Sequence, residues 1–207
     1  MHSPSSTVFL VDDDASVRRA LTRLIKSAGH QVRTFASARE FLDSDWRAYG
    51  PACLVLDVQI PGLSGLDLQR ELQTEKATLP IIFITGHGDI PMSVKAMKDG
   101  AVDFLPKPVK HTDLFRALEQ ALARAVSERA EREKMKDIQS RIDSLTPRER
   151  EVMALIVRGL LNKQVAFELG TVEKTIKVHR ARIMEKMQVG SLAELVRIAE
   201  RAGIGTT

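Results

Sequence analysis

The chain has 207 residues, of which 43% are hydrophobic, and a formal net charge of +4 at pH 7. This hydrophobic content excludes a wholly disordered chain, and the length is sufficient for two modest domains. No apolar run approaches the length of a membrane span, the opening "MHSPSST" lacks the layout of a signal peptide, and the single cysteine, Cys53, cannot form a disulfide within the chain. We therefore expect a cytoplasmic protein that has no membrane segment.

The first 110 residues alternate short β-rich runs with segments of helical spacing. The predicted strands cover residues 7–11, 31–35, 52–57, 80–85 and 102–105, and the predicted helices cover 15–28, 37–45, 64–75 and 90–99. The strands are almost fully apolar, which is typical of a parallel sheet that helices cover on both faces. The sequence therefore predicts a doubly wound α/β domain built on a five-stranded parallel sheet.

Acidic residues follow two of the predicted strands. Asp12, Asp13 and Asp14 come directly after the first strand, and Asp57 ends the third. Because ligands of a parallel sheet gather beyond the carboxyl ends of its strands, we expect these carboxylates to converge. Such a cluster of like charges predicts a bound cation, and Mg²⁺ prefers oxygen ligands. Asp14 also stands where the following helix needs an N-cap.

Two further polar residues are expected at the same edge of the sheet. Thr85 ends the fourth strand, and Lys107 follows the fifth. A carboxylate beside Mg²⁺ can attack phosphorus and form an acyl phosphate. The hydroxyl and the ammonium can then bind the phosphoryl oxygens. The pattern therefore indicates phosphoryl-group chemistry at this edge.

From Leu114 onward the pattern is helical. Nine of the fifteen residues from 127 to 141 are charged, with both signs interspersed, which predicts a solvated helical linker. Four apolar residues in this region recur every three or four positions, namely Met135, Ile138, Ile142 and Leu145. They could form a narrow seam that pairs with another helix, although four positions are too few to predict a coiled coil. We expect a first domain over residues 1–122, a helical linker over 123–143 and a second domain over 144–207.

The second domain is predicted to be all-α and to bind a polyanion. Thr146, Pro147 and Glu149 have the spacing of a capping box that begins a helix. Further helices are expected at 162–169, 172–187 and 191–202. Residues 144–207 contain 11 Lys and Arg against 7 Asp and Glu, whereas residues 1–123 contain 14 against 15. The basic excess therefore lies in the last third of the chain.

The helix expected at 172–187 is the most basic. Steps of 100° per residue place one set of side chains toward the core, namely Val172, Ile176, Ile183 and Met187. They place another set outward, namely Lys174, Lys177, Val178, Ala181 and Arg182. Small apolar groups between long basic ones suit the major groove of DNA. Arg180 falls beside the core face, where it would support the fold or touch a phosphate.

The motifs of the first domain are "VDDD", "LVLDVQIPGLSGLDL", "ITGHGD" and "GAVDFLPKP", and over about residues 6–122 they resemble the receiver domain of bacterial response regulators. The resemblance implies a flavodoxin-like fold and a partner histidine kinase that phosphorylates Asp57. It implies that Asp13, Asp57 and the Gln59 carbonyl bind Mg²⁺ directly and that Asp12 helps through water. It also implies that Thr85 and Phe104 form a switch pair and that Lys107 contacts the phosphate. His87, two residues beyond Thr85, is expected to affect the lifetime of the acyl phosphate.

Residues 144–203, with "LTPREREVMALIVRGLLNKQVAFELG" and "TIKVHRARIMEKM", resemble the four-helix helix-turn-helix domain of the NarL/FixJ (LuxR-type) regulators. This resemblance implies base contacts from Lys177, Val178 and Ala181, with promoter DNA and RNA polymerase as partners. The chain departs from the pattern at Leu161, where a small or polar residue is usual. It departs again at Val172, where a capping Ser is common, so that Thr171 is expected to cap instead.

Together these features predict a transcription factor controlled by phosphorylation, and not an enzyme. Phosphorylation of Asp57 is expected to draw Thr85 and Phe104 inward and to promote a homodimer through the face of the fourth helix, fifth strand and fifth helix.

An alternative is a Mg²⁺-dependent phosphatase or phosphotransferase of the haloacid-dehalogenase type, which also uses a strand-end Asp, a Thr or Ser and a Lys. Those enzymes place the nucleophile after the first strand in a D-x-D-G-[TS] pattern. This chain continues "DDDAS" without the glycine, and the alternative leaves the basic C-terminal third unexplained. A regulator that works without phosphorylation is disfavoured, because every receiver residue is present.

Overall fold

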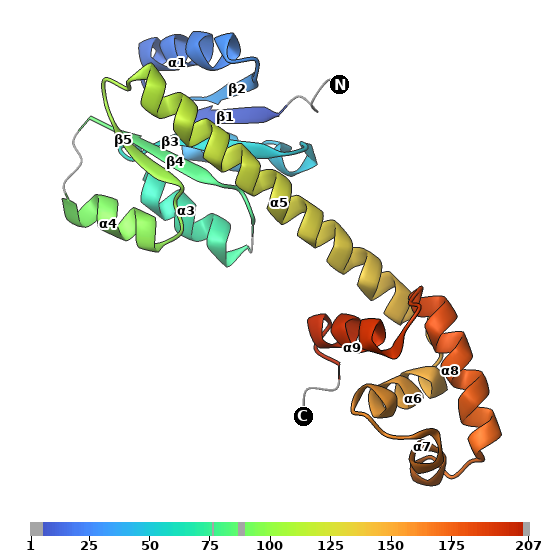
Figure 1. Ribbon diagram of the computed structural model, residues 1–207. Helices are drawn as coiled ribbons and strands as arrows, with labels where there is room; N and C mark the ends of the chain where they lie inside the picture. The colour runs from blue at the N-terminus through green and yellow to red at the C-terminus, as the bar shows by residue number, and fades with distance from the viewer. Residues whose placement is uncertain (1–5, 76, 87–89, 205–207) are drawn as a thin grey trace. The chain divides into compact units, whose positions relative to one another are not determined.

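The computed structural model describes residues 6–75, 77–86 and 90–204 (Figure 1). The chain divides into two compact units, Met1–Arg129 and Ala130–Thr207, and each is described by itself. Within the described part of the chain, no helix combines the length and the apolar character needed to cross a membrane.

The first unit is built on a five-stranded parallel sheet. Its strands are β1 (Thr7–Val11), β2 (Gln31–Phe35), β3 (Ala52–Asp57), β4 (Ile81–Thr85) and β5 (Asp103–Pro106). They lie in the order β2-β1-β3-β4-β5, so the direction of winding reverses between β1 and β3. This is the flavodoxin-like order, and ligands bind at such a reversal. The predicted fold class is confirmed.

Helices cover both faces of the sheet (Figure 1). They are α1 (Ala15–Ser27), α2 (Ala38–Leu42), α3 (Gly65–Thr74), α4 (Ile90–Lys98) and α5 (His111–Asp143). One buried cluster joins Leu21 of α1 to Leu114 of α5, and the other joins Phe41 of α2 to Leu68 of α3. The helix predicted at 37–45 ends early, and a 3₁₀ turn at Trp46–Ala48 follows that the sequence did not predict.

The second unit is all-α, as predicted. Its helices are α6 (Pro147–Val157), α7 (Asn162–Glu168), α8 (Glu173–Met187) and α9 (Leu192–Arg201). The predicted capping box is present: the Glu149 amide donates to Thr146 Oγ1 at 3.2 Å, and the Thr146 amide donates to Glu149 Oε2 at 2.9 Å. Proline at the first helical position then fixes the start of α6.

The end of α5 belongs to the core of the second unit. Ile138, Ile142 and Leu145 are buried there among side chains of α6 to α9. Met135 is 38% exposed. Three of the four seam positions therefore pack inside the unit and are not available for pairing with another helix. The division between the two units falls within α5, and the domain boundaries expected from the sequence remain a prediction.

Two predictions at the start of α8 are wrong. Val172 is 65% exposed, because the helix begins at Glu173 and Val172 is its extended N-cap residue, outside the helical wheel. Thr171 does not cap α8; its amide closes the preceding turn by donating to the Ala166 carbonyl at 2.9 Å. Among the residues that the structure describes, no side chain caps this end of α8.

An ion pair with a buried carboxylate fixes α6 against α8. Glu149 is 2% exposed, and Lys186 Nζ lies 2.6 Å from its Oε2 and 3.1 Å from the Ser144 carbonyl. The hydrogen bond from Lys186 is the main reason that the pKa of Glu149 lies below its usual value, with the Thr146 amide adding to it. A carboxylate whose pKa is depressed by folding stabilises the fold above its unfolded pKa and loses that contribution as the pH falls through the folded value.

Glu149→Gln should destabilise the second unit by about 1–3 kcal/mol at pH 7, because Lys186 would lose its charged partner. The difference in the free energy of unfolding between wild type and variant should be at its full value well above pH 4.5, the ordinary pKa of a glutamate. It should decrease as the pH falls below that value. Urea unfolding followed by NMR amide signals of α6 and α8 measures this. Glu151→Gln, an exposed neighbour paired with Arg148, is the control. Equal losses in the two variants would contradict the role of the buried pair.

Gly65 lets α3 pack directly on the end of β3. A Cβ at this position would lie 2.3 Å from the Asp57 carbonyl oxygen and 3.1 Å from the Val58 Cα, and both are backbone atoms that cannot swing aside. The Gly65 amide also donates to the Val58 carbonyl at 3.0 Å. The close approach therefore holds Asp57 and the connection that follows it in place.

Gly65→Ala should destabilise the first unit by about 1–3 kcal/mol, because the added methyl forces the backbone of β3 and α3 apart. Urea unfolding followed by the fluorescence of Trp46, which lies in this unit, measures the loss. Gly86→Ala is the matched control, because a Cβ there meets nothing within 4 Å. If the Gly65 variant is as stable as the Gly86 variant, then β3 and α3 accommodate the added methyl group without a loss of stability, which would contradict the prediction.

Candidate functional site

Three carboxylates meet where the winding of the sheet reverses. Asp12 and Asp13 follow β1, and Asp57 is the last residue of β3. Each offers an oxygen atom, and these atoms lie within 4.8 Å of one another. Asp12 and Asp57 are 0% and 4% exposed, whereas Asp13 is exposed and leaves the cluster open to solvent. The sequence-based expectation that these acids converge is met.

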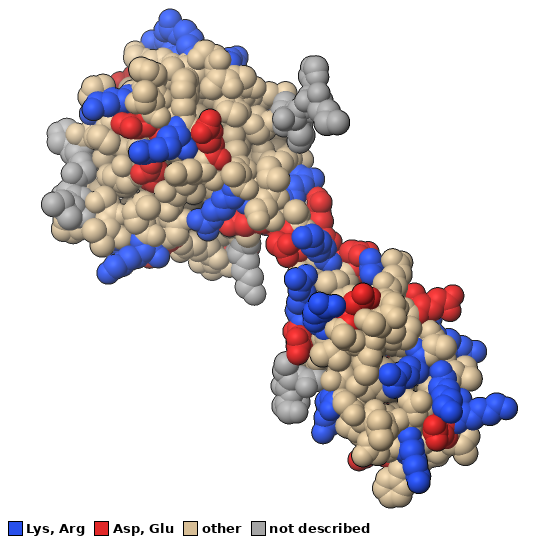
Figure 2. Space-filling view, in the orientation of Figure 1, with Lys and Arg blue, Asp and Glu red and all other residues tan. Residues whose placement is uncertain are grey.

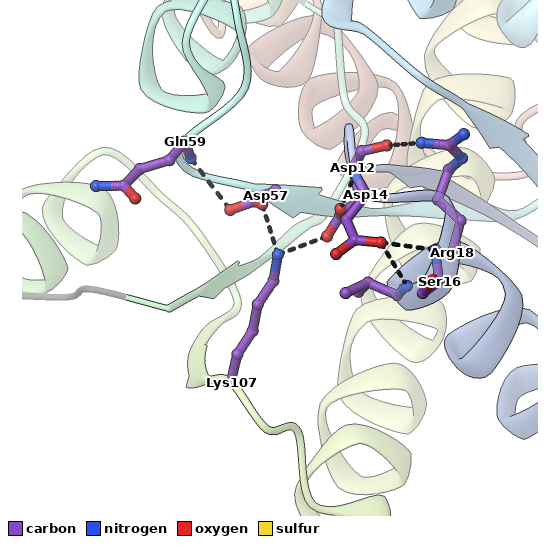
Figure 3. A network of polar contacts seen from close by, with 8 residues as sticks. Asp12, Asp14, Ser16, Arg18, Asp57, Gln59 and Lys107 are labelled. Carbon is purple, nitrogen blue, oxygen red and sulfur yellow. Dashed lines mark hydrogen bonds and ion pairs between the residues drawn. The ribbon is translucent and has the colours of Figure 1, made fainter.

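Lys107 joins the two buried carboxylates (Figure 3). Its Nζ lies 2.7 Å from Asp12 Oδ2 and 2.6 Å from Asp57 Oδ2. The Lys107 amide donates to the Thr85 carbonyl at 2.7 Å, so the backbone after β5 is fixed to the end of β4. Lys107 is therefore held in the cluster by both its side chain and its main chain.

The charges in this cluster alter two pKa values. Burial raises the pKa of Asp12, although hydrogen bonds from Lys107 and from the Asp14 amide act in the opposite direction. Burial alone would lower the pKa of Lys107, but the hydrogen bonds and charges of Asp12 and Asp57 outweigh it and leave that pKa raised. Lys107 is consequently a full cation at neutral pH.

The donor set fits a divalent cation. The cluster contains three carboxylate groups and one ammonium, so its acidic groups outnumber its cations by two. Carboxylate oxygens are hard ligands, and Mg²⁺ takes few of them from the protein while keeping several waters. The exposure of Asp13 leaves room for such waters. The residues present therefore suit Mg²⁺ in both charge and ligand type.

The hydrogen bonds of the first loop orient Asp12. The Asp14 amide donates to Asp12 Oδ1 at 2.8 Å, and Arg18 donates to the Asp12 carbonyl at 2.5 Å (Figure 3). Asp14 caps α1, as predicted, by accepting from the amides of Ser16 and Val17. Those hydrogen bonds lower the pKa of Asp14. Sequence reasoning missed Arg18, although its position four residues after the cap places it over the first turn of the helix.

The other residues expected here are close by. The Gln59 amide donates to Asp57 Oδ1 at 3.1 Å, and the role of its carbonyl as a metal ligand stays a prediction. Thr85 is 2% exposed at the end of β4, and the half-buried ring of Phe104 lies 6.1 Å from that of Phe83. His87 lies outside the described residues.

A basic surface is present on α8 of the second unit. Ile176, Ile183 and Met187 are fully buried, as the helical wheel predicted. The outward set is exposed throughout and comprises Lys174, Lys177, Val178, Ala181 and Arg182. Figure 2 shows Lys and Arg side chains gathered over the helix that Figure 1 labels α8. Exposed Val and Ala among cations are suited to base edges and thymine methyl groups.

Arg180 supports the fold. Its guanidinium donates to Asn162 Oδ1 at 3.0 Å and so ties α8 to the first residue of α7. The geometry thus confirms the structural role expected for this arginine, and a contact with a phosphate stays a prediction. Lys177 is bound only loosely, in an exposed pair 3.3 Å from Glu173 on the same helix. Such a pair contributes little and is easily exchanged for another partner.

Comparison with known proteins covers both units. Residues 8–119 match the family described as "Response regulator receiver domain", and residues 143–199 match the one described as "Bacterial regulatory proteins, luxR family". Nodulation protein W of Bradyrhizobium diazoefficiens is 50% identical over 206 residues, which cover 98% of this chain and 90% of that protein. The transcriptional regulatory protein FixJ of the same species is 43% identical over 95% of this chain and 96% of its own length.

The likeness extends to a solved structure of similar length. The response regulator StyR has a TM-score of 0.84 and 48% identity, with 96% of this chain and 100% of that chain covered. Nothing in these comparisons supports the haloacid-dehalogenase alternative. The family matches explain both the acidic cluster at the end of the flavodoxin-like sheet and the basic helix of the second unit. The chain belongs to the NarL/FixJ (LuxR-type) family of two-component response regulators, which are transcriptional regulators.

Proposed function

We propose that Asp57 accepts a phosphoryl group from a partner histidine kinase and that this modification controls the binding of promoter DNA by α8. The observation that carries the proposal is the position of Lys107 Nζ, within 2.7 Å of both Asp57 and Asp12. It neutralises part of the acidic cluster without blocking Asp57 Oδ1, which accepts only the Gln59 amide among the described residues.

In the transfer, an oxygen of the Asp57 carboxylate attacks the phosphorus of a phosphohistidine. A new O–P bond forms, the P–N bond breaks, and its electron pair remains on the imidazole nitrogen of the donor. Asp12, Asp13 and Asp57 would hold Mg²⁺, with the Gln59 carbonyl as a further ligand, and the bound ion would supply neutralisation of the phosphoryl oxygens.

Lys107 is placed to bind the product. Phosphorylation removes the charge of the Asp57 carboxylate and adds about two negative charges on the phosphoryl oxygens. A lysine already 2.6 Å from Asp57 Oδ2 can turn to those oxygens without a backbone movement. The Thr85 hydroxyl, at the end of the adjacent strand β4, would provide the second contact, and Phe104 would follow Thr85 inward.

The signal would leave the site through β4 and β5. The hydrogen bond between the Lys107 amide and the Thr85 carbonyl couples the two strand ends, so that a shift at one reaches the other. Val94 and Met97 of α4 are each 44% exposed, on a helix that packs beside β5. Apolar exposure at this position supports homodimer formation through the face of α4, β5 and α5.

The dimer would present two α8 helices to a two-fold DNA site. Lys174 and Arg182 would contact phosphates, while Lys177, Val178 and Ala181 would contact base edges. RNA polymerase is the partner through which DNA binding would change transcription. A kinase, promoter DNA and RNA polymerase as partners would support a cytoplasmic location.

Asp57→Asn should fold normally and accept no phosphate, because the amide keeps the shape of the side chain but is not a nucleophile. Incubation with a small acyl-phosphate donor and Mg²⁺, followed by intact mass measurement, tests this. Asp67→Asn on α3 changes the same charge outside the cluster and should gain mass like the wild type. An equal gain in the Asp57 variant would place the phosphoacceptor elsewhere.

Two variants of α8 should separate base contact from phosphate contact. Lys177→Ala should lose affinity mainly for the cognate site, by about 1–3 kcal/mol, and so reduce the difference from random DNA. Arg182→Ala should weaken cognate and random DNA about equally and lower the salt dependence by about one charge. Both residues are exposed, so folding should change little.

The measurement is binding to cognate and scrambled duplexes over a salt series, with the phosphorylated full chain. Arg197→Ala, an exposed arginine on α9, removes the same charge away from α8 and should have a smaller effect on both duplexes. The same pattern in the Lys177 and Arg182 variants would mean that α8 does not enter the groove by the exposed face described above.

A further inference from the structure

Helix α1 carries four positive charges that are not matched by ion pairs among the described residues. Its thirteen residues, "ASVRRALTRLIKS", contain four cations and no acid. Arg19 and Arg23 are four positions apart, and Lys26 follows three later, a spacing at which like charges repel. None of these cations, nor Arg18, forms an ion pair with a carboxylate of the described residues. Within the described part of the chain, the arginines donate hydrogen bonds to neutral oxygens: the Asp12 carbonyl, the Ser16 hydroxyl and the Arg19 carbonyl.

The four cations line one hollow surface. A groove of about 530 Å³ lies between α1 and β2, and its polar lining comprises Arg18, Arg19, Arg23, Lys26, Thr22 and Thr34. Ala15 and Val32 complete the lining, and no acidic residue contributes to it within the described part of the chain. In Figure 2, Lys and Arg side chains lie over the region that Figure 1 labels α1.

The wall of the groove also contains a hydroxyl without a partner. Thr22 Oγ1 is buried and makes no hydrogen bond with the described residues. A buried hydroxyl in this state costs free energy, and a turn of the Thr22 side chain toward the groove would let a ligand oxygen satisfy it. Guanidinium groups bind phosphate oxygens through two parallel hydrogen bonds, and three of the four cations here are arginines. Several anionic groups on one short chain would satisfy this lining.

We propose that the groove between α1 and β2 binds a small anion with a phosphoanhydride chain, either a nucleoside triphosphate or an inorganic polyphosphate. A hollow with two hydroxyls favours such a ligand over the broad surface of an acidic protein. The proposal does not depend on phosphorylation of Asp57. Arg18 connects the groove to the acidic cluster, because its guanidinium donates to the Asp12 carbonyl. A ligand that draws Arg18 into the groove would therefore act on the position of Asp12.

The test is an NMR titration of the ¹⁵N-labelled full chain with sodium tripolyphosphate in metal-free buffer. The variant Arg19→Gln/Arg23→Gln removes two groove cations, and Lys95→Gln/Lys98→Gln removes the same charge from α4 as the matched control. In wild type and control, amide signals of residues 18–26 and 31–34 should shift and saturate. In the groove variant the affinity should fall by about tenfold or more, because two charge-assisted contacts are lost.

Two further arms complete the test. Arg19→Lys/Arg23→Lys should restore part of the affinity, which separates lost contacts from a disturbed fold. Adenosine triphosphate in place of tripolyphosphate distinguishes the sources: tighter binding assigns a nucleotide, and equal binding assigns the phosphate chain alone. The proposal is overturned if the groove variant binds like the wild type, if only signals of α8 shift, or if sulfate at equal ionic strength gives the same unsaturated shifts.

Discussion

Lys107 holds Asp12 and Asp57 together at an edge of the sheet where the two carboxylates would otherwise repel each other. The contact depends on the strand order, because β1 and β3 are neighbours and end at the same edge, while the residue after β5 reaches back across β4. It also depends on the bond from the Lys107 amide to Thr85. One ammonium for three carboxylates leaves the site under-neutralised, and this residual charge suits both a metal ion and a phosphorylation switch.

The receiver fold could be predicted largely from its strands, since five apolar runs at regular spacing leave few arrangements other than a parallel sheet. The acids were found for the same reason: the carboxyl ends of parallel strands lie at one edge of the sheet, although only the strand order makes β1 and β3 neighbours. The close approach of Gly65 to the Asp57 carbonyl could not be predicted, because it depends on the angle at which α3 leaves its loop. Arg18 was missed because its contact is with a backbone oxygen, which leaves no mark in the sequence.

In the second unit the periodic pattern succeeded inside α8 and failed at its start. Ile176, Ile183 and Met187 are core residues, as their spacing required. Val172 has the same spacing but precedes the helix. The helical wheel placed its side chain toward the core, but this placement assumes a helical backbone, and the backbone of Val172 is extended. Likewise Ile138 and Ile142 have the spacing of a pairing seam and serve the core instead. A period specifies which side chains share a face, and only the tertiary structure specifies what that face meets.

Charge balance separates the structural ions of this protein from those available to ligands. Glu149 is buried and is matched one to one with the half-buried Lys186, and their pair closes the junction of α6 and α8. The acidic cluster keeps an excess of negative charge, and α1 and the exposed face of α8 keep an excess of positive charge. Each of these surfaces carries a repulsion that folding alone does not relieve. A ligand of opposite charge relieves it: a divalent cation at the sheet edge, a nucleic-acid backbone at α8, and, by the same reasoning, a phosphate-rich anion in the groove of α1.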